Sequence, residues 1–313
     1  TYIPLPQPAA DAIMRQVWPE FTDLADVVIA PSESVRRVMA EFGVRARTVV
    51  IANGIELEPF ARPRQPRTKA DFNLPDSARL LVYIGRLSIE KNLDALLEQF
   101  AGARGLVPDL HLAFIGKGPH EGELRQLAEA LELGEAVQFR GVVPYDDVPN
   151  WLAAADAFVT ASTSEVHPLT VIEAMAAGKP VAAVHSPGIT DSVESGVTGY
   201  LAGTPAGLDA AIVALMSNPE RTRIMGEAAR NASLRFDIHR TIAETMNLYE
   251  DLLATRPDLK RQKEHGRWAR RTEKWGALLD QLAEIIHPGD EGSHAMRRRW
   301  PSVNPGTRAK ADE

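Results

Sequence analysis

Two glutamates eight residues apart, Glu165 and Glu173, are the residues of this sequence best suited to chemistry. They lie in the stretch TSEVHPLTVIEAMAAGKPV, residues 163–181, on either side of a predicted helix start. Carboxylates in such positions can accept hydrogen bonds from the hydroxyl groups of a ligand. The plainer alternative is that both are solvated charges on a surface helix, where a carboxylate near the helix start is mildly stabilising.

The residues between the two glutamates predict a helix that begins with an anion site. Pro168 suits the first helical position because its missing N–H is not needed there, and Gly178 suits the C-terminal cap, so we expect a helix over 168–177. Its start presents the amides of Leu169 and Thr170 and the positive end of the helix dipole, which favours an anion. An anion site beside two carboxylates suits a ligand with both phosphates and hydroxyl groups, such as a nucleotide sugar.

A basic pair follows an apolar run in GRLSIEKN, residues 85–92. Gly85 allows a ligand to approach the backbone closely because it has no Cβ. Arg86 comes next and Lys91 five residues later, near the first turn of a predicted helix. A guanidinium fork together with an ammonium suits a diphosphate, whereas two unrelated surface cations are the alternative.

Two glycine turns follow later apolar runs. Gly116, Lys117 and Gly118 form one turn in GKGP, and Val142 lies in the other, RGVVP. Tight turns of this kind expose backbone N–H and C=O groups, which can contact the edge of a nucleobase. A single Gly-x-Gly is weak evidence for such a role.

The elements that must position these residues are short apolar runs alternating with helical segments. Continuous apolar strands separated by helices predict a parallel sheet that is covered on both faces. In such a sheet ligands bind beyond the carboxyl ends of the strands, where the residues above are expected to meet. The predicted strands lie within 25–30, 47–55, 79–87, 110–118, 136–144, 155–162, 179–186 and 199–202. The predicted helices are 32–42 with Ser32 as N-cap, segments from 90 and from 120, 148–154, 168–177 and 205–254.

The distribution of these elements predicts four parts of the chain. Residues 63–237 hold six strand-and-helix units, which suffice for one doubly wound domain. Residues 1–62 hold only two strands and a helix, too few for an independent sheet, and are expected to be the end of a domain whose beginning is absent. The Pro-rich and charged stretch 58–75 is expected to be a linker. Residues 238–256 are expected to form one helix, and 257–313 a helical and then poorly ordered tail.

Composition excludes several classes of protein. The chain has 313 residues, of which 44% are hydrophobic and 25% charged, with a formal net charge of -7 and no cysteine. This balance argues against a nucleic-acid binder and against a disulfide framework. No apolar stretch approaches the roughly 20 residues that span a bilayer, and the first residues do not resemble a signal peptide. We therefore expect a cytoplasmic protein.

The basic end of the chain is the one feature that suggests a membrane. Arg297, Arg298, Arg299 and Trp300 could contact an anionic surface, which would place the protein peripherally at the inner membrane face. A solvated basic tail is the alternative.

The quoted motifs, in the order GRLSIEKN, FIGKGP, FRGVVPYDDVPNWLAAADAFVTASTSE and EVHPLTVIEAMAAGKPV, resemble the C-terminal domain of GT-B retaining glycosyltransferases of family four. The resemblance covers about residues 20–255, and Glu165 and Glu173 match the family's glutamate-x7-glutamate motif. It implies an α/β fold of GT-B type, with a complete doubly wound C-terminal domain and an N-terminal Rossmann-like domain only partly present.

The resemblance also implies a role for each matched residue. Arg86 and Lys91, with the helix amides, would bind the diphosphate of the donor; Glu173 would hold the ribose, and Glu165 would lie against the transferred sugar. The implied catalytic residues are Glu165, Arg86 and Lys91. The implied donor-binding residues are Gly85, Arg86, Lys91, Gly116, Lys117, Gly118, Val142, Glu165, His167, Pro168, Leu169, Thr170 and Glu173.

The implied reaction moves a hexose, glucose being the first candidate, from a nucleotide-diphosphate sugar with retention of configuration. No cofactor or metal ion is implied, and a UDP-sugar is favoured over a GDP-sugar as donor. The likeness is greatest to members that glycosylate diacylglycerol, so the acceptor is expected to be a sugar or a glycolipid. An incomplete N-terminal domain would also favour self-association.

One departure from the family pattern concerns the loop after Glu165. Relatives often have a glycine where this chain has His167 and Pro168, so the loop should be stiffer. His167 could donate a hydrogen bond to a sugar or phosphate oxygen, or it could simply be packed. Two alternative functions remain: a non-catalytic fragment that binds nucleotide sugars, and a GT-B sugar epimerase or phosphorylase.

Overall fold

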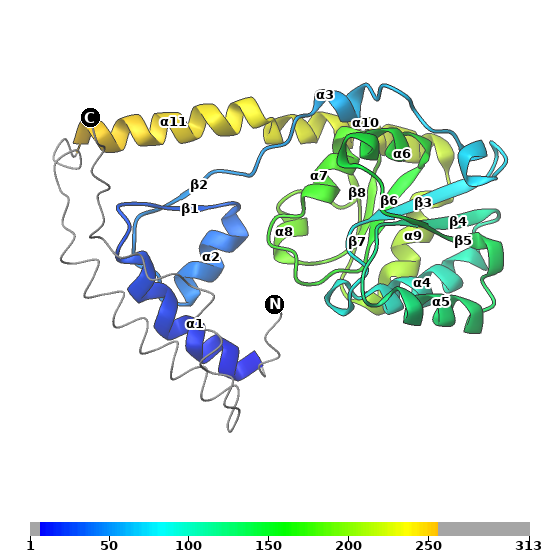
Figure 1. Ribbon diagram of the computed structural model, residues 1–313, viewed down its shortest axis with the longest axis horizontal. Coiled ribbons are helices and arrows are strands. Elements are labelled where there is room, and N and C mark those ends of the chain that lie inside the picture. The colour runs from blue at the N-terminus through cyan, green and yellow to red at the C-terminus, as the bar shows by residue number, and fades with distance from the viewer. Residues whose placement is uncertain (1–6, 256–313) are drawn as a thin grey trace, which may run out of the picture. The chain divides into compact units, whose positions relative to one another are not determined.

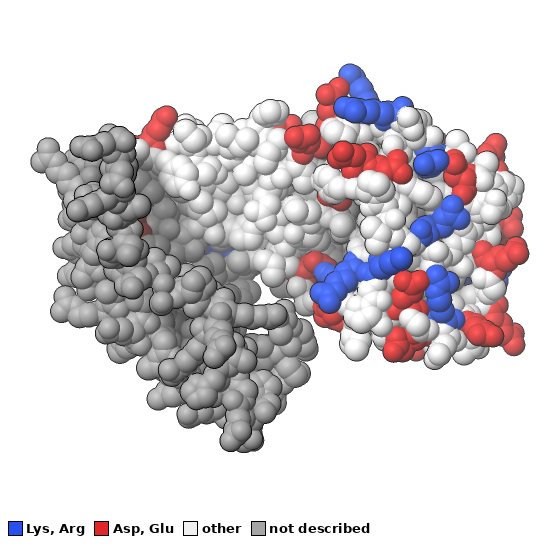
Figure 2. Space-filling view, in the orientation of Figure 1, with Lys and Arg blue, Asp and Glu red and all other residues white. Residues whose placement is uncertain are grey.

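A computed structural model gives the structure of the protein and describes residues 7–255 (Figure 1). The predictions for 256–313, including the basic cluster at Arg297 to Trp300, lie outside the described residues. Among the described helices, none is long and apolar enough to cross a membrane. On the face drawn in Figure 2, basic and acidic side chains are interspersed over the domain that carries the larger sheet.

The larger sheet has six parallel strands, as the apolar runs predict. In chain order they are β3 (Arg79–Ile84), β4 (Leu110–Ile115), β5 (Val137–Gly141), β6 (Ala157–Thr160), β7 (Val181–Val184) and β8 (Gly199–Ala202). Their order across the sheet is β5-β4-β3-β6-β7-β8. The chain therefore moves outward from β3 in one direction, returns to β6, and then moves outward in the other. The point between β3 and β6, where the direction changes, is where such sheets bind ligands.

Helices cover both faces of this sheet and create two cores (Figure 1). On one face lie α4 (Leu93–Arg104), α5 (Glu121–Ala130) and α9 (Leu208–Met216); on the other lie α6 (Val148–Ala154) and α7 (Leu169–Ala176). Alternate residues of β3 enter different cores, because side chains alternate along a strand: Leu81 packs with the first set and Leu80 with the second. Both are buried, which for a leucine stabilises the fold by about 1.5–3 kcal/mol.

The N-terminal residues form a smaller unit of secondary structure. It comprises α1 (Gln7–Thr22), β1 (Val28–Ala30), α2 (Glu33–Glu41) and β2 (Thr48–Val50), and the two strands pair in parallel. Ser32 is the N-cap of α2, as predicted, and its hydroxyl accepts a hydrogen bond from Val35 N at 3.3 Å. Helix α1 was not among the expected elements. The domain boundaries at 62 and 237 stay predictions.

The C-terminal stretch 205–254, expected to be helical with a separate helix at 238–256, contains three helices. Helix α9 ends at Met216, and Asn218 is the N-cap of α10 (Pro219–Ser233). Helix α11 (Ile238–Thr255) follows a second interruption. Helix α10 packs on both α7 and α9. The short helices are α3 (Glu58–Ala61), α8 (Pro187–Thr190) and the 3-10 turns η1 (Lys69–Phe72), η2 (Ile89–Lys91), η3 (Gly134–Ala136), η4 (Tyr145–Asp147), η5 (Pro205–Gly207) and η6 (Leu234–Phe236).

The stretch 58–75, expected to be a linker, is fastened to the six-stranded domain. Phe60 and Phe72 are buried in the core beside α6 and α7, so this segment is part of the packed structure. Pro and charged residues dominate its composition, but the two phenylalanines decide where it lies.

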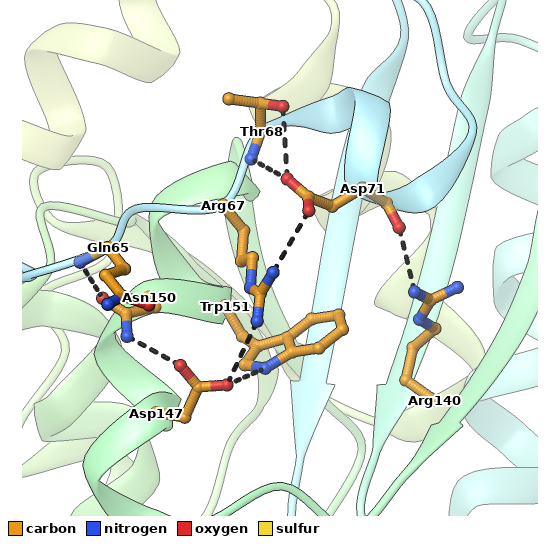
Figure 3. Close-up of polar contacts among 8 residues, drawn as sticks. All are labelled: Gln65, Arg67, Thr68, Asp71, Arg140, Asp147, Asn150 and Trp151. Atoms are coloured by element: carbon orange, nitrogen blue, oxygen red, sulfur yellow. Dashed lines mark hydrogen bonds and ion pairs between the residues drawn. The ribbon is translucent and has the colours of Figure 1, made fainter.

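Polar contacts hold the same segment in place (Figure 3). Arg67 lies between Asp71, with Nη1 3.3 Å from Oδ1, and Asp147, with Nη2 3.7 Å from Oδ2. Its guanidinium also lies over the ring of Trp151, and Arg140 approaches that ring at 5.2 Å. Arg140 ends near Asp71, whose carbonyl accepts from Nη2 at 2.9 Å. These contacts tie the segment to the end of β5 and to α6.

Asp147 is the centre of this cluster, and its loss should be measurable. Its carboxylate accepts hydrogen bonds from Asn150 Nδ2 and Trp151 Nε1, both at 2.7 Å. The bond from Asn150 is the main cause of the lowered pKa of Asp147. Asp147→Ala should reduce the free energy of unfolding by about 2 kcal/mol because it leaves these donors without an acceptor. Thermal melting should show a fall of about 4–8 °C.

The neighbouring Asp146 provides the matched control. It is exposed and makes no hydrogen bond within the described residues, so Asp146→Ala should leave the melting temperature nearly unchanged. Because the pKa of Asp147 is lowered, its stabilising effect is present above the ordinary aspartate value and disappears as the pH falls through the folded-state pKa. A wild-type advantage that persists at low pH would contradict this assignment.

Candidate nucleotide-sugar site

A pocket of about 320 Å³ lies where the sheet changes direction, between the carboxyl ends of β3 and β6 and the start of α7. Eight of the thirteen predicted donor-binding residues line it, together with Tyr83, Ile84, Thr160 and Val171. The eight are Gly85, Arg86, Lys91, Glu165, His167, Pro168, Leu169 and Thr170. Residues separated by up to 85 positions in the sequence are thus brought to one place.

The start of α7 presents two unbonded amides to this pocket. The helix begins at Leu169, and Pro168 is its N-cap with ψ 95°, so the expectation that Pro168 occupies the first helical position is wrong. The carbonyl of Pro168 accepts from Val171 N at 3.1 Å and from Ile172 N at 3.2 Å. The N–H groups of Leu169 and Thr170 have no acceptor within the described residues, which leaves them for an anion.

The turn after β3 leaves the guanidinium of Arg86 free. Gly85 has φ +155°, and a Cβ at this position would lie 2.9 Å from Tyr83 Oη. That hydroxyl donates to the carbonyl of Arg86 at 3.0 Å, and burial raises the pKa of Tyr83, so it remains a donor. The guanidinium of Arg86 is exposed and makes no hydrogen bond within the described part of the chain. The backbone is therefore held while the charged group is available.

Lys91 and Glu165 form an ion pair across the pocket. Lys91 Nζ lies 2.7 Å from Glu165 Oε1, and both side chains are largely buried. Lys91 ends the 3-10 turn η2, and α4 begins only at Leu93 because Asn92 adopts a left-handed conformation with φ 55°. Lys91, predicted to bind phosphate, and Glu165, predicted to contact the sugar, are thus each other's partner when no ligand is bound.

The glycine turns outside the pocket have a clear structural reason for their glycines. A Cβ on Gly116 would lie 1.9 Å from the carbonyl oxygen of Gly85, and one on Gly118 would lie 1.9 Å from that of Leu87. The Gly-x-Gly therefore allows two loop backbones to touch. The amide of Gly116 donates to the carbonyl of Gly141 at 2.8 Å. This bond places the turn that contains Lys117 beside the turn that contains Val142.

Both residues predicted to contact a base, Lys117 and Val142, are exposed, Val142 to 67%. They do not line the pocket described above. The structure brings their turns together at the same edge of the sheet, and their contact with a base stays a prediction.

Glu173 is a buried carboxylate with one hydrogen-bond donor. It is 5% exposed, and its Oε1 accepts from the hydroxyl of Tyr145 at 3.0 Å. Burial raises the pKa of Glu173 and, with the charge of Glu173 nearby, raises that of Tyr145 to about 12. Glu173 Oε2 makes no hydrogen bond with any described residue. A buried carboxylate with so few donors is costly unless a ligand supplies hydroxyl groups.

His167 is engaged by a residue far away in the sequence. Its Nε2 lies 3.1 Å from the carbonyl oxygen of Asn53, and because a carbonyl only accepts, Nε2 carries the hydrogen. Burial lowers the pKa of His167, so the ring is neutral near pH 7 and has this single N–H. Of the two alternatives for His167, the packed one is favoured, because the hydrogen that it could have donated to a sugar or phosphate oxygen is already used. The ring edge also packs against Phe236.

Sequence reasoning missed three residues that shape this site: Tyr83, Tyr145 and Asn53. Tyr145 carried the clearest signal, since it is an aromatic residue just after a glycine turn at a strand end. Tyr83 read as an ordinary member of an apolar strand. Nothing in the local sequence of Asn53 indicated that its carbonyl would meet His167.

A parallel sheet wound in both directions, with helix amides and an arginine at its switch point that have no partner among the described residues, defines a doubly wound α/β domain with an anion-binding pocket. The chain belongs to the family described as "Glycosyl transferases group 1", whose model matches residues 64–232. The model described as "Glycosyltransferase Family 4" matches residues 1–59. The resemblance found in the motifs is thereby confirmed.

Among curated relatives, alpha-monoglucosyldiacylglycerol synthase from Streptococcus pneumoniae is 34% identical over 201 residues, which are 62% of this chain and 46% of the relative. The chain spans about half the length of the curated relatives it matches. Among solved structures, Anabaena Alr3699/HepE in complex with UDP-glucose matches with TM-score 0.66 and 27% identity, over 79% of this chain and 70% of the other. Sucrose-phosphate synthase from Thermosynechococcus elongatus, at TM-score 0.70 and 24% identity, shares the fold.

Proposed function

We propose that the pocket at the switch point binds the diphosphate and sugar of a UDP-sugar, and that the protein transfers the hexose to an acceptor with retention of configuration. The observation that carries this proposal is the convergence of three groups that have no hydrogen-bond partner among the described residues: the guanidinium of Arg86 and the amides of Leu169 and Thr170. All three are donors, and together they suit a diphosphate at the end of the sheet where α/β domains bind nucleotides.

The same groups account for a chemical step. When the bond between sugar and diphosphate breaks, negative charge develops on the leaving phosphate. Arg86 and the helix amides are donors that are already in place before the reaction and that stabilise this charge as it develops. Such preorganised donors usually make the largest single contribution to catalysis. Lys91 joins them when the diphosphate takes the place of Glu165. Glu165 then lies free beside the sugar.

The relatives support the choice of substrates. Alr3699/HepE was solved with UDP-glucose, which favours a uridine nucleotide and glucose. The curated relative is named a synthase of alpha-monoglucosyldiacylglycerol, which favours a diacylglycerol lipid as acceptor. The acceptor would approach the open side of the pocket.

The test begins with calorimetric titration of UDP, GDP, UDP-glucose and GDP-mannose. Micromolar binding of UDP and UDP-glucose, with weaker binding of the guanosine nucleotides, is the expected result. Transfer is then measured with vesicles containing diacylglycerol, and the anomeric configuration of the product is read by NMR. Failure of all four nucleotides to bind would overturn the proposal; binding without transfer would reduce the chain to a donor-binding protein.

Glu173→Gln should weaken UDP binding about tenfold. The amide keeps the shape of the side chain, but one carboxylate oxygen becomes a donor and the charge that strengthens a hydrogen bond from ribose is lost. Calorimetry with UDP measures the effect, and 2′,3′-dideoxyuridine diphosphate, which lacks the ribose hydroxyls, is the matched ligand. Equal losses for both ligands would show that Glu173 does not bind the ribose.

The same variant should be more stable than the wild type at pH 7. Burial raises the pKa of Glu173 above its ordinary value of 4.5, so the ionised carboxylate destabilises the fold once the pH exceeds the folded-state pKa. The gain in melting temperature should be largest above that pKa and should vanish as the pH falls below 4.5. A destabilised variant at pH 7 would mean that Glu173 is a structural residue.

A further inference from the structure

A second and larger cavity, of about 550 Å³, lies at the opposite edge of the sheet. It is bounded by the residues that precede β3 and β6, by the end of α7 and by one face of α10. Arg79 and Asp156 mark the amino ends of the strands, and Gly178 and Lys179 follow α7. None of the residues assigned to the donor pocket lines it.

Basic side chains outnumber acidic ones around this cavity. Five basic residues line it against three acidic ones: Lys69, Arg79, Lys179, Arg223 and Arg230, with Asp76, Asp156 and Glu227. Two of the basic residues have carboxylate partners within the protein, since Arg223 pairs with Glu220 and Glu227, and Lys69 with Asp156. The other three have no carboxylate partner in the part of the chain that the structure describes.

The remaining cations have only carbonyl partners or none. Lys179 Nζ donates to the carbonyls of Ala153 at 2.9 Å and Ala155 at 2.6 Å, and Arg230 Nη2 donates to that of Ala177 at 3.3 Å. The guanidinium of Arg79 makes no hydrogen bond or ion pair within the described residues. A carbonyl satisfies a donor but does not neutralise its charge, and the one acidic residue without an ion pair, Asp76, is exposed to solvent.

The pKa of Lys179 reflects the excess of positive charge around the cavity. Burial lowers its pKa to about 8; the charge of Asp156 opposes this effect, while those of Arg230 and Lys69 add to it. Around Lys179 there are thus one carboxylate, Asp156, which already pairs with Lys69, and two further cations, Lys69 and Arg230. Lys69, Arg79 and Lys179 are partly buried and Arg230 is exposed, and a group of cations around a cavity is stabilised when a counter-ion enters.

The carbonyl bonds could be taken to mean that Lys179 and Arg230 serve only to cap helix ends. They use two of the three N–H groups of Lys179 and one of the five of Arg230. The remaining donors and the whole guanidinium of Arg79 have no described acceptor. Capping of helix ends therefore accounts for some of the hydrogen bonds of Lys179 and Arg230. It does not account for the excess of positive charge around the cavity.

We propose that this cavity is a second anion-binding site, which takes a small ligand with more than one negative charge, of the phosphate or pyrophosphate class. Arg79, Lys179 and Arg230 are its binding residues. The site lies at the far end of α7 from the donor pocket, so one helix of eight residues, about 12 Å long, has its start in one site and its end at the other.

Inorganic pyrophosphate is the probe, titrated by calorimetry into the full chain. Because pyrophosphate should also bind at the donor pocket, the titration uses Arg86→Ala as background, which leaves the second site intact. We expect binding in this background, and a loss of about tenfold when Arg79→Gln is added. The guanidinium of Arg79 has no partner in the described structure, so the substitution should not affect folding, which melting checks. Arg104→Gln is the matched control, since Arg104 is exposed and its guanidinium makes no hydrogen bond with any described residue.

Lys179 gives an independent, residue-specific measurement in the unmodified protein. Acetylation by acetic anhydride, followed by mass spectrometry, should be slowed at Lys179 by pyrophosphate. The proposal is overturned if pyrophosphate does not protect Lys179. It is equally overturned if Arg104→Gln reduces affinity as much as Arg79→Gln, because the binding would then reflect general charge.

Discussion

Replacing Arg86 with alanine should weaken UDP binding about a hundredfold while leaving the melting temperature unchanged. The guanidinium is exposed and makes no hydrogen bond within the described residues, so the fold does not depend on it. A two-pronged, charge-assisted contact to a diphosphate lies at the upper end of the energies of single hydrogen-bonding groups, about 3 kcal/mol, which corresponds to a factor of about a hundred. Calorimetric titration of UDP, with scanning calorimetry of both proteins, measures the two quantities.

Arg104→Ala removes the same charge from an exposed position at the end of α4. It should change UDP affinity less than twofold at 0.15 M salt, where distant surface charges are screened. If Arg86→Ala and Arg104→Ala lose UDP affinity equally, UDP is attracted by the overall charge of the protein, and the assignment of the pocket fails. If Arg86→Ala binds UDP as the wild type does, the diphosphate lies elsewhere.

Gly116→Ala should have the largest effect on stability. The residue has φ +139°, where a side chain is strained, and its Cβ would lie 1.9 Å from the carbonyl oxygen of Gly85. Backbone atoms cannot yield as a flexible side chain can, so the two loops must separate. We expect a loss of about 4 kcal/mol in the free energy of unfolding, seen as a fall of about 8–16 °C in the melting temperature.

Gly122→Ala is the matched substitution. Gly122 lies in α5, where a Cβ would meet nothing within 4 Å, and alanine favours a helix over glycine by up to about 1 kcal/mol. This variant should be slightly more stable than the wild type. Similar melting temperatures for the two variants would show that the turn at Gly116 can relax without cost, and that its glycine is not required by the contact with Gly85.

The fold could be predicted from sequence because its signals are local and repeated. Each strand of the six-stranded sheet is a short apolar run, and α6 was expected at its observed bounds of Val148–Ala154. The start of α4 could not be predicted as well, since Asn92 takes a left-handed conformation that the surrounding charged residues do not reveal. The stretch 58–75 was misjudged because its composition is that of a loop, whereas two buried phenylalanines determine its packing.

The candidate site was predictable to the extent that strand ends in a parallel sheet converge. That rule brings Arg86 and the start of α7 together without any knowledge of individual contacts. It cannot supply the pairings within the site. Lys91 meets Glu165 across 74 positions, and His167 meets Asn53 across 114. Such contacts depend on the exact path of loops, for which a single sequence carries no periodic signal.

If Lys91 binds the donor diphosphate as proposed, its ion pair with Glu165 makes the capture of that diphosphate an exchange of counter-ions. In the protein alone, Glu165 already neutralises Lys91 at 2.7 Å. A diphosphate that takes over Lys91 must release that carboxylate, so the measured affinity is the difference between two ion pairs. The release also means that occupation of the phosphate positions and liberation of Glu165 are a single event. The carboxylate of Glu165 is then released beside the sugar only when the diphosphate has replaced it as the partner of Lys91. An uncharged nucleoside would leave the ion pair between Lys91 and Glu165 intact.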